Sequence, residues 1–237
     1  MTYTVIARCP QTRRVGIGIA TYSIGVGLYC NGLRGGIGVT ITQAFVNQGN
    51  NTLALRLLAL GFAPAAVLDE LMANDPDAEY RQIGVIDREG RVAAYSGSRT
   101  RGHASHRIGD GYIAMGNVLT GRHVVEAIAD AYEAEPGEKL ERRLLRAIEA
   151  GRDAGGQQGN DGHLTERSAA LLVYGDQDYA ELDLRVDLHE LAVDELRRSF
   201  EEYEPYRAYY RDRGQNPKDA VPQDVFVASL PQVEAVR

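Results

Sequence analysis

The chain has 237 residues, and its 33 aspartates and glutamates outnumber its 26 lysines and arginines, which gives a formal charge of −7. This length suits one large domain with a substantial core. Acidic and basic residues are mixed and no basic block occurs, so we expect no nucleic-acid partner. No apolar run approaches the ~20 residues of a membrane span, and the N-terminus has no secretory signal pattern. The two cysteines, Cys9 and Cys30, lack a metal-type spacing, and we expect them to be reduced in a cytoplasmic protein.

The hydrophobic pattern predicts strand pairs alternating with helix pairs. Predicted strands cover residues 2–8, 15–20, 36–42, 81–87, 91–96, 112–116, 168–174 and 181–187. Predicted helices cover residues 51–60, 64–73, 121–134, 138–150 and 189–203. The glycine-rich stretches 21–35 and 155–165 are predicted to be loops. This order differs from the strand–helix alternation of a doubly wound sheet and fits antiparallel sheets with helices on their outer faces.

Glycines within the second predicted strand and a change of composition near the C-terminus add two expectations. Gly16 and Gly18 lack side chains, so another element is expected to approach that strand closely. After Glu204 the chain becomes rich in Pro, Tyr, Arg and Gln. We therefore expect a domain over residues 1–203 and a tail over 204–237 that forms a surface arm or contacts a second subunit.

Thr2 stands directly at the start of the first predicted strand. An initiator Met is usually removed when a small residue follows, and Thr2 would then carry a free α-amine beside its hydroxyl. The reference pKa of such an amine is about 7.7–8.0, so a neutral fraction exists at physiological pH. A Thr hydroxyl activated by its own N-terminal amine is a recognised nucleophile. A small hydroxyl residue at position 2 also arises by composition alone, so a purely structural role stays open.

Seven short motifs carry a family resemblance over about residues 2–200. The motifs span residues 2–8, 15–21, 42–44, 81–87, 97–112, 116–121 and 167–173 of this sequence. In this order they resemble the domain-of-unknown-function family 1028, which is similar to the N-terminal-nucleophile (Ntn) hydrolases. The resemblance implies an α+β fold, a four-layer αββα sandwich of two antiparallel sheets. It also implies hydrolysis of an amide or related C–N bond in a small cytoplasmic metabolite, with Thr2 as nucleophile, in a homo-oligomer that we expect to be a dimer.

His106 lies at a position where the family pattern has His, within the segment from His103 to Arg107. Histidine titrates near neutral pH and can act as a general acid or base. A hydrogen-bonded structural His is an equal alternative. The spacing of His103 and His106 is compatible with zinc, but no suitably spaced Cys or carboxylate accompanies them, so we expect no metal.

Five further polar residues are candidates for the pocket wall. Thr42, Gln43 and Asn117 follow strands and could hydrogen-bond a polar substrate, although such residues equally often pin turns. Thr21 and Ser23 follow the second strand, where a sandwich of this type places a pocket wall. The glycine-rich segments lack the Gly-Lys-Ser/Thr and Gly-x-Gly-x-x-Gly helix patterns, so we expect no nucleotide or other cofactor.

Two alternatives to the Thr2 hydrolase remain open. Proteasome-type Ntn hydrolases use a Lys and an Asp near the nucleophile, and residues 21–23 supply neither. That absence favours a non-catalytic protein that binds a small molecule or a partner. The second alternative is a hydrolase whose site is built around His106 and not around the N-terminus.

Overall fold

The computed structural model describes residues 1–231, which divide into two compact units, Met1–Arg197 and the described residues from Arg198 onward. Residues 232–237, the last part of the predicted tail, lie outside the described residues. The predicted boundary between residues 203 and 204 stays a prediction.

The larger sheet of the first unit has eight antiparallel strands in the order β10-β9-β8-β1-β2-β11-β12, with β7 also paired to β8. Its strands are β1 (Thr2–Arg8), β2 (Val15–Thr21), β7 (His103–Gly109), β8 (Tyr112–Leu119), β9 (Gln157–Gly159), β10 (Gly162–Leu164), β11 (Ser168–Tyr174) and β12 (Ala180–Val186). The strand β1 is central and pairs with β2 on one side and β8 on the other. Thr2 is opposite Asn117 in the second of these pairings.

The smaller sheet has four antiparallel strands in the order β3-β4-β5-β6. They are β3 (Asn31–Arg34), β4 (Gly38–Ala44), β5 (Arg81–Asp87) and β6 (Val92–Ser96). Short helical turns at α1 (Val26–Tyr29) and Ala78–Tyr80 lead into this sheet. Gln43 is opposite Gln82 in the β4–β5 pairing.

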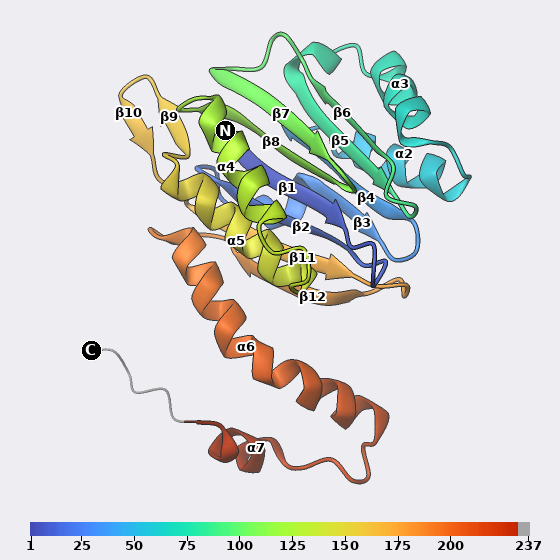
Figure 1. Cartoon of the computed structure of the whole chain (residues 1–237), viewed down its shortest axis with the longest axis vertical. Coiled ribbons are helices and arrows are strands. Elements are labelled where there is room, and N and C mark those ends of the chain that lie inside the picture. Colours follow the sequence, from blue (N-terminus) through green and yellow to red (C-terminus); the bar gives the residue numbers. More distant parts are fainter. Residues whose placement is uncertain (232–237) are drawn as a thin grey trace. The chain divides into compact units, whose positions relative to one another are not determined.

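Helices cover the outer faces of both sheets (Figure 1). Helices α4 (Arg122–Glu133) and α5 (Leu140–Asp153) pack on the larger sheet, and α2 (Gln48–Ala59) and α3 (Pro64–Asn74) pack on the smaller one. The two sheets face each other, so the unit is a four-layer αββα sandwich of two antiparallel sheets. The predicted α+β fold class is confirmed.

Alternate residues of the strands form the core between the sheets. Ile6, Ile41, Ile113 and Met115 are fully buried there, because every second side chain of a strand points to one face of its sheet. Gly84 lies among them, and a Cβ at this position would be 2.9 Å from Ile41. The core is therefore packed closely enough that even a methyl group needs adjustment.

On the opposite face of the larger sheet, the strand glycines allow a helix to approach. A Cβ at Gly18 would lie 2.9 Å from the Leu144 carbonyl oxygen of α5, and a Cβ at Gly16 would lie 2.7 Å from the Leu144 side chain. The expected close approach at these glycines is confirmed. Cys9 and Cys30 are both free and buried.

Several element predictions were wrong. The predicted loop 21–35 contains α1 and β3, the predicted loop 155–165 contains the β9–β10 hairpin, and β7 was missed entirely. The strands in these segments have few apolar residues and form because neighbouring strands offer them backbone partners, which overrides weak local propensity. The predicted helix 189–203 is α6 (Ala192–Gln215), which continues through Pro205.

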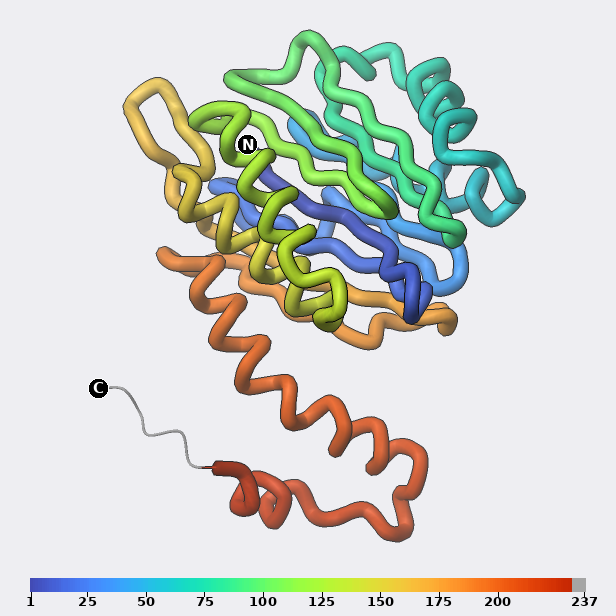
Figure 2. Tube along the Cα trace, in the orientation of Figure 1, coloured from blue at the N-terminus to red at the C-terminus, as the bar shows by residue number. Residues whose placement is uncertain are grey.

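The second unit contains the greater part of α6 and a short helix, α7 (Gln223–Ser229). Figure 2 traces both along the chain. Tyr209 stacks on Phe226 with ring centroids 4.1 Å apart and an angle of 6° between the rings. The aromatic composition noted in the sequence therefore serves contacts within this unit.

Candidate active site

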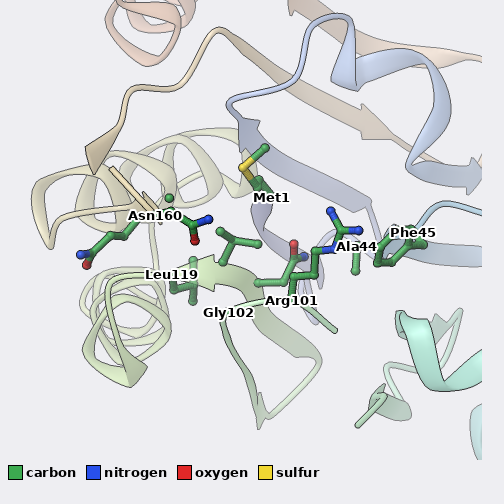
Figure 3. A pocket seen from close by; sticks show the side chains of 11 residues that line it. Met1, Ala44, Phe45, Arg101, Gly102, Leu119 and Asn160 are labelled. Atoms are coloured by element: carbon green, nitrogen blue, oxygen red, sulfur yellow. The ribbon is translucent and has the colours of Figure 1, made fainter. Parts of the chain in front are cut away.

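A pocket of about 520 Å³ opens beside the N-terminal end of β1 (Figure 3). Five chain segments supply its walls, namely Met1, the end of β4 with Ala44 and Phe45, the turn before β7 with Arg101 and Gly102, the end of β8 with Asn117, Val118 and Leu119, and the β9–β10 hairpin with Gln158, Gly159 and Asn160. The antiparallel pairing of β1, β8 and β9 places these segments next to one another. The N-terminus of the chain is thus part of a pocket wall.

Thr2 lies directly under Met1 and is buried, with 5% of its surface exposed. Its hydroxyl donates to the Met1 carbonyl oxygen at 2.6 Å and lies 3.3 Å from Oγ1 of Thr21. The Thr21 hydroxyl also donates to the Met1 carbonyl and accepts the Ser23 N–H at 3.2 Å. The Met1 carbonyl is therefore held by two threonine hydroxyls.

The α-amine at this end of the chain has a perturbed pKa. Burial lowers the pKa of the Met1 amine below its ordinary value, Arg101 lowers it further, and Cys30 acts in the opposite direction. A lowered pKa raises the fraction of neutral amine at pH 7. An amine in this location is therefore better able to accept a proton than one in water.

Behind the pocket, a chain of buried amides joins the two sheets. Gln82 Oε1 accepts from Gln43 Nε2 at 3.0 Å and from Asn117 Nδ2 at 2.9 Å. Gln82 Nε2 donates to the Gly116 carbonyl at 2.9 Å, and the Thr4 hydroxyl donates to Gln43 Oε1 at 2.6 Å. Asn117 is the member of this network that reaches the pocket wall.

His106 lies at the far side of the same network. Its Nδ1 is 2.9 Å from the Ser96 hydroxyl, which accepts from Gln82 Nε2 at 2.9 Å. Burial lowers the pKa of His106, which favours the neutral ring. His106 is not among the residues that line the pocket beside Thr2.

Two non-glycine residues of the pocket wall have left-handed backbone conformations. Ala44 has φ 72° and Val118 has φ 56°. A positive φ is unusual for an L-residue and particularly so for a β-branched one. Such strain persists only where the surrounding structure holds it, and it is found preferentially at functional sites.

The structure brings together some of the predicted site residues and separates others. Thr2, Thr21, Ser23 and Asn117 lie at one end of the sandwich, and Gln43 joins them through Gln82. Thr42 points to the other face of its strand, where its hydroxyl donates to Asn51 of α2 at 3.2 Å. His106 reaches the group only through Ser96 and Gln82.

Sequence reasoning gave no role to Gln82 or Arg101. Gln82, like Gln43, is a long polar side chain at an inward position of a buried strand, and this pattern could have identified it. Arg101 lies in a turn, where no periodicity distinguishes it from other surface arginines. Within residues 1–231, no group of three or more His, Cys, Asp or Glu side chains could hold a metal ion. No helix in that part of the chain is long and apolar enough to cross a membrane.

The sandwich and its pocket define an α+β protein whose first strand begins at the wall of a polar cavity. The chain belongs to the family of unknown function DUF1028, whose model matches residues 2–196. The family predicted from the sequence motifs is confirmed. The chain is similar to protein SPO2555 from Silicibacter pomeroyi, with 27% identity, a TM-score of 0.77 and 85% of each chain covered.

Two more distant likenesses are to Anbu (ancestral beta-subunit) structures. Anbu from Yersinia bercovieri has 11% identity and a TM-score of 0.41, with 98% of this chain and 99% of that chain covered. The Anbu (Gly-1) mutant from Hyphomicrobium sp. strain MC1 has 13% identity and a TM-score of 0.40, with 92% and 100% covered. Likenesses this distant carry no argument about function. No curated protein matches the chain.

Proposed function

We propose that the protein is an Ntn-type hydrolase that cleaves an amide or related C–N bond of a small cytoplasmic metabolite, with Thr2 as nucleophile after removal of Met1. One observation carries the proposal: Met1 lines the pocket and covers the Thr2 hydroxyl, which donates to its carbonyl oxygen at 2.6 Å. Loss of Met1 would open the cavity onto the Thr2 hydroxyl and create an α-amine on the same residue. The nucleophile and its base would then belong to the same residue.

The hydrogen bonds around Thr2 support this chemistry. The Thr21 oxygen accepts the Ser23 N–H and lies 3.3 Å from the Thr2 oxygen. Without the Met1 carbonyl, the Thr21 oxygen would accept an N–H of the new α-amine, which would leave the lone pair of that amine free for the Thr2 proton. Burial and the charge of Arg101 already lower the pKa of the Met1 amine, and the same surroundings would disfavour the charged form of an α-amine on Thr2.

The proposed reaction has two halves. The Thr2 oxygen attacks the substrate carbonyl while its proton passes to the α-amine, and that proton then leaves with the departing amine as the C–N bond breaks. Water next attacks the Thr2 ester with the α-amine as base, which releases the acid and restores the hydroxyl. The Asn117 amide at the pocket wall uses one N–H toward Gln82 at 2.9 Å, and its second N–H is suited to the substrate carbonyl oxygen.

The first test is the intact mass of untagged protein made with its natural start. A mass without Met is the expected result, and retention of Met1 in the bulk of the sample would overturn the mechanism. Thr2→Ser and Thr2→Ala both keep a small second residue, so Met removal should proceed in both. An acylating β-lactone should modify the wild-type protein and Thr2→Ser but not Thr2→Ala. The exposed Thr52 of α2 offers a matched control, because Thr52→Ala should react like the wild type.

A screen of small amides gives the corresponding activity test. We expect Thr2→Ala to lose at least about a thousandfold in turnover, as is usual when a nucleophile is removed. A short N-terminal extension that blocks the amine should have the same effect.

We also propose that the protein is cytoplasmic and forms a homodimer. Light scattering on the purified protein tests the dimer.

Two alternatives give different results in these assays. A non-catalytic binding protein is favoured by the absence of Lys, Asp and Glu from the described pocket lining, and it predicts ligand binding that Thr2→Ala leaves intact, with no turnover in the wild type. A site around His106 is favoured by its 2.9 Å contact with Ser96. That site predicts activity that is abolished by His106→Ala and is insensitive to an N-terminal extension.

A further inference from the structure

The pocket beside Thr2 contains one charged side chain, and it is a cation. Among the described lining residues, Arg101 is accompanied by the uncharged amides of Asn117, Gln158 and Asn160 and by apolar residues and glycines. None of the described lining residues is acidic. The chain as a whole carries a charge of −7, and acidic residues outnumber basic ones. A pocket whose one charged side chain is a cation therefore differs from the average composition of the chain.

Arg101 is held by its backbone and by a ring, and not by an ion pair. Its carbonyl oxygen accepts the Val118 N–H at 3.1 Å, and its guanidinium carbon lies 5.1 Å from the centre of the Phe45 ring. No carboxylate within residues 1–231 lies within ion-pair distance of it. Stacking on a ring occupies one face of the guanidinium and leaves its edge N–H groups available.

Two other arginines of the same unit are paired with carboxylates. Arg107 contacts Glu126 at 3.0 Å, Asp130 at 2.6 Å and Glu133 at 2.8 Å. Arg81 contacts Asp75 at 3.1 Å. Arg101 differs from these two in having no carboxylate partner among the described residues, so its charge-assisted donors are available to a group that enters the pocket.

Arg101 is also close to the proposed reacting end of the chain. It shares the pocket wall with Met1, and its charge contributes to lowering the pKa of the Met1 amine. An anion bound at Arg101 would thus lie within the same cavity of about 520 Å³ as the proposed nucleophile. A cavity of this volume holds a small molecule.

We propose that the substrate is a small amide that carries a carboxylate, which Arg101 binds while the C–N bond is presented to Thr2. This inference rests on the proposed hydrolase function and names its substrate class. Arginine presents a planar set of donors that matches a carboxylate with two parallel hydrogen bonds. One cation balances one negative charge, so a carboxylate fits this pocket better than a phosphate dianion.

The test measures binding separately from turnover. Full-length Thr2→Ala protein is titrated by calorimetry with a panel of N-acetyl amino acids and with the matching N-acetyl amino acid amides, which lack the negative charge. We expect at least one acid to bind about tenfold or more tightly than its amide, since hydrogen bonds to charged groups are roughly twice as strong as neutral ones. Adding Arg101→Gln should abolish this preference, and Arg101→Lys should restore part of it.

Arg56 provides the control, because it is an exposed arginine of α2 outside the pocket lining. Arg56→Gln changes the net charge by the same amount and should leave the preference unchanged. Equal binding of acids and amides across the panel, or a preference that survives Arg101→Gln, would overturn carboxylate recognition. Competition by inorganic phosphate at lower concentration than by the acids would overturn the choice of carboxylate over phosphate.

The outcome is distinguishable from failure of the hydrolase proposal. Carboxylate binding without a β-lactone adduct on the wild-type protein would leave a binding protein for acidic amides. An adduct on Thr2 without any carboxylate preference would leave a hydrolase for neutral amides. In either case only one of the two proposals is lost.

Discussion

Replacing Gln82 with Leu should remove the connection between the two sheets at the candidate site. Gln82 Oε1 accepts from Gln43 at 3.0 Å and from Asn117 at 2.9 Å, and its Nε2 donates to the Gly116 carbonyl at 2.9 Å. Gln82 is fully buried, as is Gln43, and Asn117 is 1% exposed. Leu has a similar volume, so the substitution Gln82→Leu removes the hydrogen bonds without creating a large cavity.

The expected cost follows from the donors that lose their partner. Two buried amide groups, Nε2 of Gln43 and Nδ2 of Asn117, would each be left without an acceptor. Each buried donor without a partner costs about 1–3 kcal/mol of folding stability, and two donors lose their partner. The buried Leu side chain offsets a small part of this cost, so we expect a net loss of about 3 kcal/mol. That is a large part of the roughly 5–15 kcal/mol that stabilises an ordinary domain.

Urea unfolding followed by circular dichroism measures this loss as a shift of the midpoint at constant slope. Gln48, exposed at the start of α2, gives the matched control, and Gln48→Leu should change the free energy of unfolding by no more than about 0.5 kcal/mol. If Gln82→Leu cost no more than Gln48→Leu, the network would not stabilise the fold and the reasoning from its hydrogen bonds would be wrong. A loss of about 3 kcal/mol with unchanged turnover of small amides would show that Asn117 does not depend on Gln82 for its position.

Three further predictions concern the same unit. A Cβ at Gly84 would lie 2.9 Å from Ile41, so Gly84→Ala should destabilise by about 1–3 kcal/mol in urea unfolding, whereas Gly137→Ala in open space should not. Ala44 has φ 72°, so Ala44→Gly should relieve strain and raise stability by up to about 1 kcal/mol, and a loss of stability would contradict this. Burial lowers the pKa of His106 in the folded protein, so as the pH falls the imidazole is protonated in the unfolded chain before it is protonated in the folded one. The free energy of unfolding should therefore decrease as the pH drops below about 6.5, the ordinary pKa of histidine. Melting temperatures between pH 5 and 8 should show a smaller fall in His106→Asn.

The sequence predicted the layers of the fold because the strongest signals were periodic. The helices α4 and α5 each bury one apolar face, and the apolar runs of β1, β2 and β11 identified strands that are almost fully buried. The strand β7 (His103–Gly109) was not predicted because its sequence is mostly polar and half-buried. Its pairing with β8 depends on the tertiary structure, which the local sequence does not show. The hairpin β9–β10 escaped for the same reason.

The candidate site was less predictable than the fold. Thr2 and Asn117 were found from their positions at strand ends, and their pairing across β1 and β8 explains why both lie at the same place. Thr42 and Gln43 looked equivalent in the sequence, but adjacent residues of a strand point to opposite faces, and only the strand register shows which face is which. Arg101 could not be found, because the closure of the pocket depends on how turns from three separate strands meet.

The polar residues at the N-terminal end of β1 interrupt a core that is apolar elsewhere. Thr4 and Ile6 occupy successive inward positions of one strand, as Gln43 and Ile41 do on β4. An apolar side chain at the first of each pair would continue the core without the cost of removing amides from water. The strands β5 and β8 also carry polar residues at inward positions here, Gln82 and Asn117. The pocket wall beside them holds two residues with strained backbone, Ala44 and Val118. Departures from local rules that gather at one location are expected at functional sites, and this clustering is a physical reason to expect chemistry at Thr2.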